Sequence, residues 1–166
     1  RSVNCETVQI FVKSNMQWFG KVPSEVDTKR FTTELAKGDV GPVFGHAGYL
    51  INLAGPDGNN LEKSMESLVK EIEIASMLNV PFLVLHPGAH LGQGEEAGIK
   101  RIAKSLDQIF KATKKSSVRI ALENTAGQGT YLGHQISHLA EIFDNVKQQD
   151  RLGICLDTAH FFAAGY

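Results

Sequence analysis

Short apolar runs alternate along the chain with longer helix-like stretches, and this alternation limits the folds that are open to it. The apolar runs are rich in Val, Ile, Leu and Phe and lie at 8–12, 42–45, 82–86, 118–122 and 153–156. Such runs are typical of parallel strands covered on both faces. The stretches between them have helix-like caps or apolar residues at three- to four-residue spacing, and lie at 24–38, 60–80, 95–115 and 133–146. The pattern predicts βα units around a parallel sheet.

The number of expected strands leaves two architectures open. The 166 residues fit one domain, 1–166, and the 42% hydrophobic content is that of a folded globular chain. A full (β/α) barrel needs about 250 residues, whereas an open doubly wound sheet can close with five strands. Both architectures place active sites at the carboxyl ends of the strands.

Charge and cysteine content exclude several classes of protein. The net charge of −1 provides no global field for nucleic acid, so such a partner would be held by a local basic surface or by metal ions. The two cysteines, Cys5 and Cys155, predict no disulfide framework. No apolar run is long enough to cross a membrane, and no signal peptide opens the sequence. Because the first residue is not Met, we expect the sequence to begin inside a longer protein.

Metal-competent side chains follow four successive predicted strands. They are His46, His86, Glu123 and Asp157, and His160 lies three residues beyond Asp157. Each has an ordinary alternative: a strand-end histidine can be a hydrogen-bonded structural residue, and Glu123 or Asp157 can cap the next turn or helix. Their repetition at one edge of a parallel sheet instead predicts a site for Zn²⁺ or Mn²⁺.

Three further histidines are interpreted differently. His90 lies in HPGAH, where Pro-Gly breaks any helix, and we expect it to support the loop. His134 and His138 lie one helical turn apart, which suits metal binding but equally suits a partly exposed helix face; we favour the latter. The glycine-rich loop 126–129 can serve a phosphate or only a tight turn.

Two predicted loops carry candidate contact residues on the same rim. Tyr49 and Leu50 follow His46, where they either pack locally or act as a wedge between bases. Gln17 lies in the loop SNMQW after the first strand, beside Trp18, which we expect to pack.

Four motifs in this order and spacing resemble the endonuclease IV family of apurinic/apyrimidinic endonucleases: GHAGYLINLA, LHPGAH, LENTAGQG and CLDTAHFFAAGY. The resemblance runs from about Val8 to Tyr166. It implies a TIM barrel, here a partial barrel of about five strands truncated at both ends. It also implies a trinuclear zinc site, with Mn²⁺ as an alternative in part of it. The implied reaction of base excision repair is incision 5′ to an abasic site, leaving a 3′-hydroxyl and a 5′-deoxyribose phosphate.

The resemblance also assigns roles to the metal-competent residues. His46 and His86 look like ligands of one zinc, and Glu123 looks like the carboxylate that bridges it to a second zinc and acts in catalysis. Asp157 looks like a ligand of that second zinc, and His160 like a ligand of the third.

The implied partner is double-stranded DNA with abasic sites. Tyr49 and Leu50 are similar to residues that enter the minor groove, and Gln17 joins them as a DNA contact. Met16 stands where the family leads us to expect a basic residue. The resemblance further implies a monomer when complete, no membrane, and an intracellular location in bacterial cytoplasm or a eukaryotic nucleus or mitochondrion.

Strands expected at both ends, with further ligands, are absent from this sequence, so we expect the piece alone to be poorly stable and weakly active. Three alternatives remain: a sugar isomerase or epimerase of the xylose-isomerase-like barrels, a truncated paralogue that binds DNA without cutting it, and a doubly wound module that binds phosphate through loop 126–129.

Overall fold

The sheet has five parallel strands whose order in space is their order in the sequence. The computed structural model describes residues 4–38 and 40–166. Each strand pairs with its sequence neighbours in the order β1-β2-β3-β4-β5: β1 Val8–Phe11, β2 Val43–His46, β3 Phe82–Leu85, β4 Arg119–Glu123 and β5 Leu152–Cys155. A doubly wound sheet reverses its strand order at a switch point, and this sheet does not. The sequential order is that of a barrel wall and confirms the predicted partial barrel.

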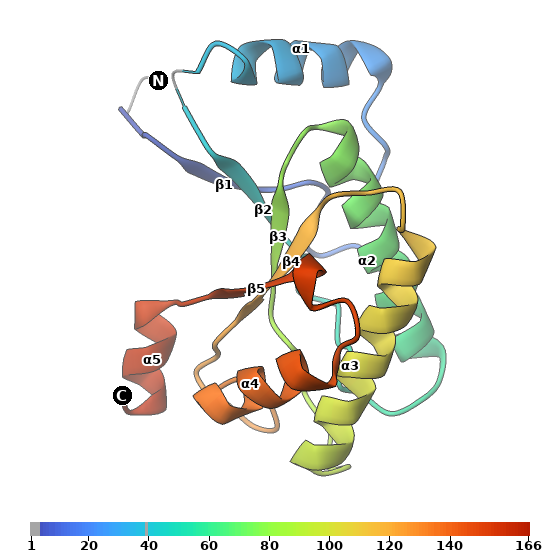
Figure 1. Cartoon of the computed structure of the whole chain (residues 1–166), viewed down its shortest axis with the longest axis vertical. Helices are drawn as coiled ribbons and strands as arrows, with labels where there is room; N and C mark the ends of the chain where they lie inside the picture. Colours follow the sequence, from blue (N-terminus) through green and yellow to red (C-terminus); the bar gives the residue numbers. More distant parts are fainter. Residues whose placement is uncertain (1–3, 39) are drawn as a thin grey trace.

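Helices connect the strands, and a further helix follows the last strand. They are α1 Glu25–Leu35, α2 Asn59–Met77, α3 Glu95–Ala112, α4 Ile136–Asn145 and α5 Thr158–Ala164, with a short 3₁₀ turn, η1, at Gln149–Arg151. Helices α1 to α4 connect the strands, and α2, α3 and α4 bury side chains against one face of this wall. Figure 1 shows α2 and α3 packed along the same side of the sheet. Ser24 caps α1 as expected, since its hydroxyl accepts the Asp27 N–H at 3.1 Å.

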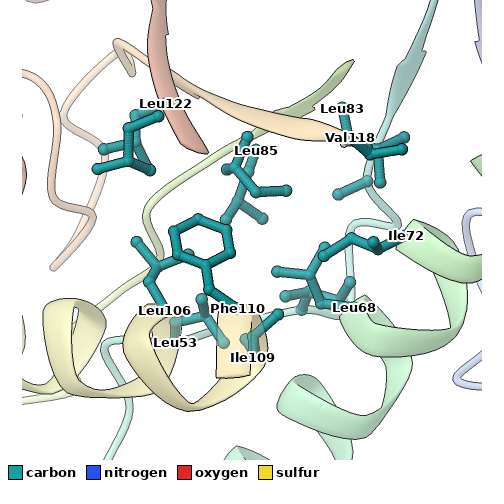
Figure 2. Close-up of a cluster of buried hydrophobic side chains, with 14 of the residues drawn as sticks. Leu53, Leu68, Ile72, Leu83, Leu85, Leu106, Ile109, Phe110, Val118 and Leu122 are labelled. Carbon is teal, nitrogen blue, oxygen red and sulfur yellow. The ribbon is translucent and has the colours of Figure 1, made fainter. Parts of the chain in front are cut away.

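The hydrophobic core lies between the sheet and the helices. Phe110 of α3 is fully buried and lies among side chains of β3, β4 and α2 in Figure 2, which include Leu83, Leu85, Leu122 and Leu68. Side chains alternate along a strand, so Leu122 of β4 faces the helices while the next residue, Glu123, faces the concave side of the wall. This alternation places the strand-end polar residues on the side away from the helices.

All five expected strands are present, with ends shifted by one residue, and all four expected helices form. The last helix, α5, was not predicted, although an N-cap at Asp157 was considered. Within the described ranges both cysteines are free, and no helix has the length and apolarity needed to span a bilayer.

Candidate metal centre

Glu123 lies at the centre of a cluster of imidazole and carboxylate groups. Its side chain is 8% exposed, and one oxygen, Oε2, lies 2.8 Å from His86 Nε2 and 3.2 Å from His46 Nε2. The other oxygen, Oε1, lies 3.9 Å from His160 Nδ1. The carboxylate therefore presents one oxygen to the β2 and β3 residues and the other to the residues that follow β5.

The five predicted ligands form two groups that share Glu123. His46, His86 and Glu123 form one group, and Glu123, Asp157 and His160 form the other; in each, one ligand atom per residue lies within 4.8 Å of the rest. The structure thus brings together the residues that the sequence placed at the ends of β2, β3, β4 and β5.

Backbone carbonyls hold two of the histidines in a metal-competent tautomer. His46 Nδ1 lies 2.7 Å from the Ala47 carbonyl oxygen, and His160 Nδ1 lies 2.9 Å from that of Asn124. Because a carbonyl only accepts, each Nδ1 carries a proton, and this frees Nε2 to bind metal when the ring is neutral. Metal-binding histidines commonly have such a carbonyl or carboxylate behind them.

The cluster lowers the pKa of the Glu123 carboxyl group and raises the pKa of the His46 imidazole. Burial alone raises the pKa of Glu123, but hydrogen bonds with His46 and His86 outweigh burial and lower the pKa to about 2. Burial lowers the pKa of His46, but its hydrogen bonds to Glu123 and the Ala47 carbonyl outweigh burial, so the net shift is upward from 6.5. Glu123 is therefore an anion throughout the neutral range and a charged ligand for a cation.

The donor set fits borderline divalent metals. Imidazole nitrogen and carboxylate oxygen are the ligands that Zn²⁺ takes in sites with open positions, and Mn²⁺ accepts the same carboxylates. The side chains of His86, His160 and Asp157 are 27%, 28% and 36% exposed, so the centre is open on one side. This openness suits a centre that meets a substrate more than a purely structural site.

Asp157 combines a helix cap with its place in the metal group. Its Oδ1 accepts the His160 N–H at 2.8 Å and caps α5. The cap and the ligand role were alternatives in the sequence, yet they are compatible because a carboxylate has two oxygens. Asn124, which sequence analysis did not single out, holds the Asp157 backbone from the adjacent strand end.

An open pocket of about 290 Å³ lies over the histidines. His46, His86, His160 and Tyr49 line it, together with Tyr131, Thr125 and residues 126–128 of the glycine-rich loop. The Tyr49 ring is 53% exposed and meets the His46 ring edge to face, with centroids 5.5 Å apart. Tyr49 therefore stands at the mouth of the pocket, in direct contact with a predicted ligand.

Leu50 and Gln17 lie in the loops after β2 and β1, on the same rim as Tyr49. Leu50 lines a second pocket with Trp18, and Gln17 is exposed in the loop after β1. The two rim segments are joined directly, since the Tyr49 N–H donates to the Asn15 carbonyl at 3.1 Å. The structure thus brings the predicted contact residues to one end of the sheet.

The remaining histidines lie in a different cluster. His138 is 3% exposed, so the expectation of a partly exposed helix face is wrong for it. Its Nδ1 accepts the Gly133 N–H at 3.3 Å, and its Nε2 lies 3.4 Å from Glu95. Because Nδ1 accepts a hydrogen bond, Nε2 carries a proton and lies within ion-pair distance of the Glu95 carboxylate, while the His134 ring meets the His138 ring edge to face with centroids 4.8 Å apart. This tautomer keeps Nε2 of His138 from serving as a metal ligand.

His90 supports its loop, as the Pro-Gly turn indicated. Its Nδ1 accepts the Gly94 N–H at 3.1 Å, and its own N–H donates to the Thr130 carbonyl at 3.0 Å. The first bond lies within the loop after β3, and the second links that loop to the loop after β4.

A parallel wall with imidazole and carboxylate groups at its carboxyl edge, placed so that they could hold a metal ion, is the arrangement of a TIM barrel with a candidate metal site. The sequence model of the family described as xylose isomerase-like TIM barrel matches residues 1–166. A protein named probable endonuclease 4 from Nitratidesulfovibrio vulgaris is 48% identical over 161 residues, which cover 97% of this chain and 57% of that protein. One of the same name from Chloroflexus aurantiacus is 44% identical over 99% of this chain and 58% of that protein.

Solved structures show the same fold. The crystal structure of endonuclease IV from Thermus thermophilus superposes with a TM-score of 0.80 at 33% identity, over 99% of this chain and 57% of that one. A D-tagatose 3-epimerase-like protein superposes with a TM-score of 0.74 at 21% identity, over 93% of this chain and 57% of that one, and shows the fold alone. The chain belongs to the endonuclease IV family of xylose isomerase-like TIM barrels, and it spans a little over half the length of these relatives.

Proposed function

We propose that the chain carries part of the catalytic site of a zinc-dependent DNA repair endonuclease. The reaction is hydrolysis of the phosphodiester 5′ to an abasic site in double-stranded DNA, which leaves a 3′-hydroxyl and a 5′-deoxyribose phosphate. The observation that carries the proposal is the position of Glu123, whose two oxygens face two groups of metal-competent side chains beneath an open pocket. The names of the relatives at 44–48% identity agree with it.

The residues of this chain would hold metal ions on both oxygens of the Glu123 carboxylate. His46 and His86 would hold a zinc ion with Oε2 of Glu123, and Asp157 and His160 would bind on the Oε1 side. Clustered zinc ions supply Lewis-acid stabilisation of a phosphodiester and activation of water near neutral pH. The ionised state of Glu123 matches this role, because an anionic bridge compensates the charge of neighbouring cations.

The rim residues are proposed to meet the DNA. Tyr49 is an exposed ring at the pocket mouth and can stack on a base beside the abasic site. Leu50 and Gln17 lie on the same rim, where an apolar group and an amide would contact the minor groove. Met16 is 65% exposed at the position where a basic residue was expected, and a thioether provides apolar contact without phosphate attraction.

The experiment is incision of a duplex oligonucleotide that carries one abasic-site analogue, with and without added Zn²⁺. The chain is compared with Glu123→Gln, which preserves shape and removes the anionic bridge. The matched control is Glu66→Gln, which makes the same chemical change at an exposed position on α2. Metal-dependent cutting beside the analogue, lost in Glu123→Gln and kept in the control, supports the proposal.

Two other outcomes would contradict it. Binding of the abasic duplex without cutting, by a chain that has taken up zinc, would favour a DNA-binding protein without catalysis. Activity on ketose sugars without activity on DNA would favour an epimerase, whose likeness to this chain lies at 21% identity or less and shows only the fold. The proposal further expects the complete protein to be a monomer in solution, which sedimentation tests.

A further inference from the structure

A buried ion pair lies beside the metal centre but belongs to neither ligand group. Lys13 Nζ lies 2.9 Å from Glu71 Oε1, and the two side chains are 2% and 1% exposed. Lys13 lies two residues after the end of β1, and Glu71 comes from the middle of α2. Charged groups are rarely this deeply buried unless they are paired, and the placement of this pair therefore calls for a physical reason.

The pair joins the two loops that form the proposed DNA rim. Lys13 Nζ donates to the Gln17 carbonyl at 2.6 Å and to the Ser14 carbonyl at 3.3 Å, which holds the loop after β1. The Glu71 carboxylate accepts the Gly48 N–H, with its two oxygens at 3.2 and 3.1 Å, which holds the loop after β2. One ion pair thus connects the backbone beneath Gln17 with the backbone beneath Tyr49.

The pair is packed closely against the backbone of Gly48. A Cβ on Gly48 would lie 2.8 Å from Lys13 Nζ and 3.2 Å from Glu71 Oε1, so the backbone approaches the pair as closely as only glycine allows. The three donors of the ammonium group match its three acceptors, and both carboxylate oxygens are used. A fully satisfied buried pair of this kind favours a single arrangement of the segments that it joins.

Stability alone does not account for the pair. Burying two charges costs desolvation that their attraction only offsets, so an apolar pair of similar volume often gives equal or greater stability. The ion pair differs from an apolar pair in its directed hydrogen bonds, and all of the bonds beyond the pair itself go to the two rim loops.

We propose that Lys13 and Glu71 are positioning residues that fix the loop of Gln17 and the loop of Tyr49 in one register for binding abasic DNA. This inference rests on the proposed function for its ligand, but the positioning itself is measured without DNA. It assigns the pair no contact with the reacting atoms.

The test replaces the pair by apolar residues, Lys13→Met with Glu71→Leu. The matched control is Lys70→Met with Glu73→Leu, which removes an ion pair of 3.0 Å on the same helix whose side chains are 49% and 53% exposed. Three quantities are measured: hydrogen exchange at single amides, zinc stoichiometry, and affinity of the metal-free chain for a duplex with an abasic-site analogue.

The most informative amide is that of Tyr49. Its acceptor, the Asn15 carbonyl, is untouched by the substitutions, so faster exchange there reports loss of register between the loops and not loss of an acceptor. The amide of Ala47 donates to the Val84 carbonyl at 2.8 Å on the neighbouring strand and reports the sheet itself. A general destabilisation would accelerate both amides together.

We expect at least tenfold faster exchange at Tyr49, unchanged exchange at Ala47, unchanged zinc stoichiometry and at least tenfold weaker binding of the abasic duplex. Unchanged exchange at Tyr49 would overturn the inference, whatever the affinity. If the unsubstituted chain fails to bind the abasic duplex, the proposed function fails and the exchange experiment still decides the positioning. Should the double variant not fold, Glu71→Gln is tested by the same Tyr49 exchange, with the same two outcomes.

Discussion

The side-chain amide of Asn124 pairs with both backbone polar groups of Asp157. Its Oδ1 accepts the Asp157 N–H at 2.6 Å, and its Nδ2 donates to the Asp157 carbonyl at 3.0 Å. The Asn124 amide thus continues the pairing of β4 with β5 by one step beyond the strands. Because the Asn124 carbonyl also accepts from His160 Nδ1, one buried residue orients both ligands on the Oε1 side of Glu123.

Replacing Asn124 by leucine keeps the number and branching of its side-chain heavy atoms and removes both bonds. We expect Asn124→Leu to lower the free energy of unfolding by about 1–3 kcal/mol, because the Asp157 backbone groups lose their buried partners. Metal affinity of the group of Glu123, Asp157 and His160 should fall about 10–100-fold, the usual cost of losing a residue that supports ligands. The group of His46, His86 and Glu123 should keep its affinity. Titration with Co²⁺, followed by its visible absorption, separates the two groups; equal loss at both would contradict the assignment.

The metal-free chain should be most stable in mildly acidic solution. The pKa of Glu123 is lowered from 4.5 to about 2, so its contribution is present above pH 4.5 and is lost as the pH falls toward 2. The pKa of His46 is raised from 6.5, so its contribution is present below pH 6.5 and is lost as the pH rises through the folded-state value. Between pH 4.5 and pH 2, the free energy of unfolding should fall by something on the order of 2 kcal/mol. Urea unfolding in EDTA measures the free energy of unfolding across this pH range. Glu123→Gln should weaken its dependence on pH on both the acidic and the neutral side.

Zinc uptake should release protons near neutral pH. The raised pKa of His46 keeps part of its imidazole protonated there, and only the neutral ring binds metal. Apparent zinc affinity should therefore rise as the pH increases from 6.5. Calorimetric titrations at pH 7 in two buffers with different ionisation enthalpies measure the released protons. An identical heat in both buffers would mean that His46 is already neutral before binding.

Gly88 should not tolerate a side chain. Its φ is +115°, and a Cβ would lie 2.3 Å from Asn52 Oδ1. That oxygen accepts the N–H groups of Ala54 and Ala89, each at 3.0 Å, and so holds the loops after β2 and β3 together. We expect Gly88→Ala to cost about 2–4 kcal/mol in unfolding free energy, through backbone strain and displacement of the Asn52 amide. Urea denaturation measures this.

The control for that change is a glycine whose surroundings have space for a side chain. Gly153 in β5 has no atom within 4 Å of the position that a Cβ would take, and it has no positive φ. Gly153→Ala should leave the free energy of unfolding within about 0.5 kcal/mol, as is usual at unconstrained sites. A cost comparable to that of Gly88→Ala would show that the loss of glycine itself, and not the Asn52 contact or the positive φ, decides the effect.

Much of the site could be predicted because its ligands are local to strand ends. His46, His86 and Glu123 each follow or close an apolar run, and parallel strands bring such positions to one edge whichever architecture forms. Asp157 and His160 follow the same rule. The helix that Asp157 caps, α5, was not predicted because its seven residues are too few to show helical periodicity. The number of strands left barrel and doubly wound sheet open; the family resemblance predicted the barrel, and the strand order confirms it.

The supporting contacts could not be predicted, because they join residues that are distant in sequence. Asn124 and Asp157 are 33 positions apart and carry no pattern that links them. Lys13 looked like an ordinary polar residue at the end of a strand, and Glu71 like one of many charges on an amphipathic helix. His138 was misjudged because its helix has an apolar side, and an imidazole with two polar partners can be buried on that side.

The sequential strand order gives the ligand set an order of synthesis. Each strand pairs with the one made just before it, so the wall can grow from β1 toward β5 as the polypeptide leaves the ribosome. The group of His46, His86 and Glu123 is complete before Asp157 and His160 have been translated. If the chain binds zinc as proposed, the first ligand group is available to a cation before the second group exists, and the arrival of Asp157 and His160 adds that second group to an edge already in place.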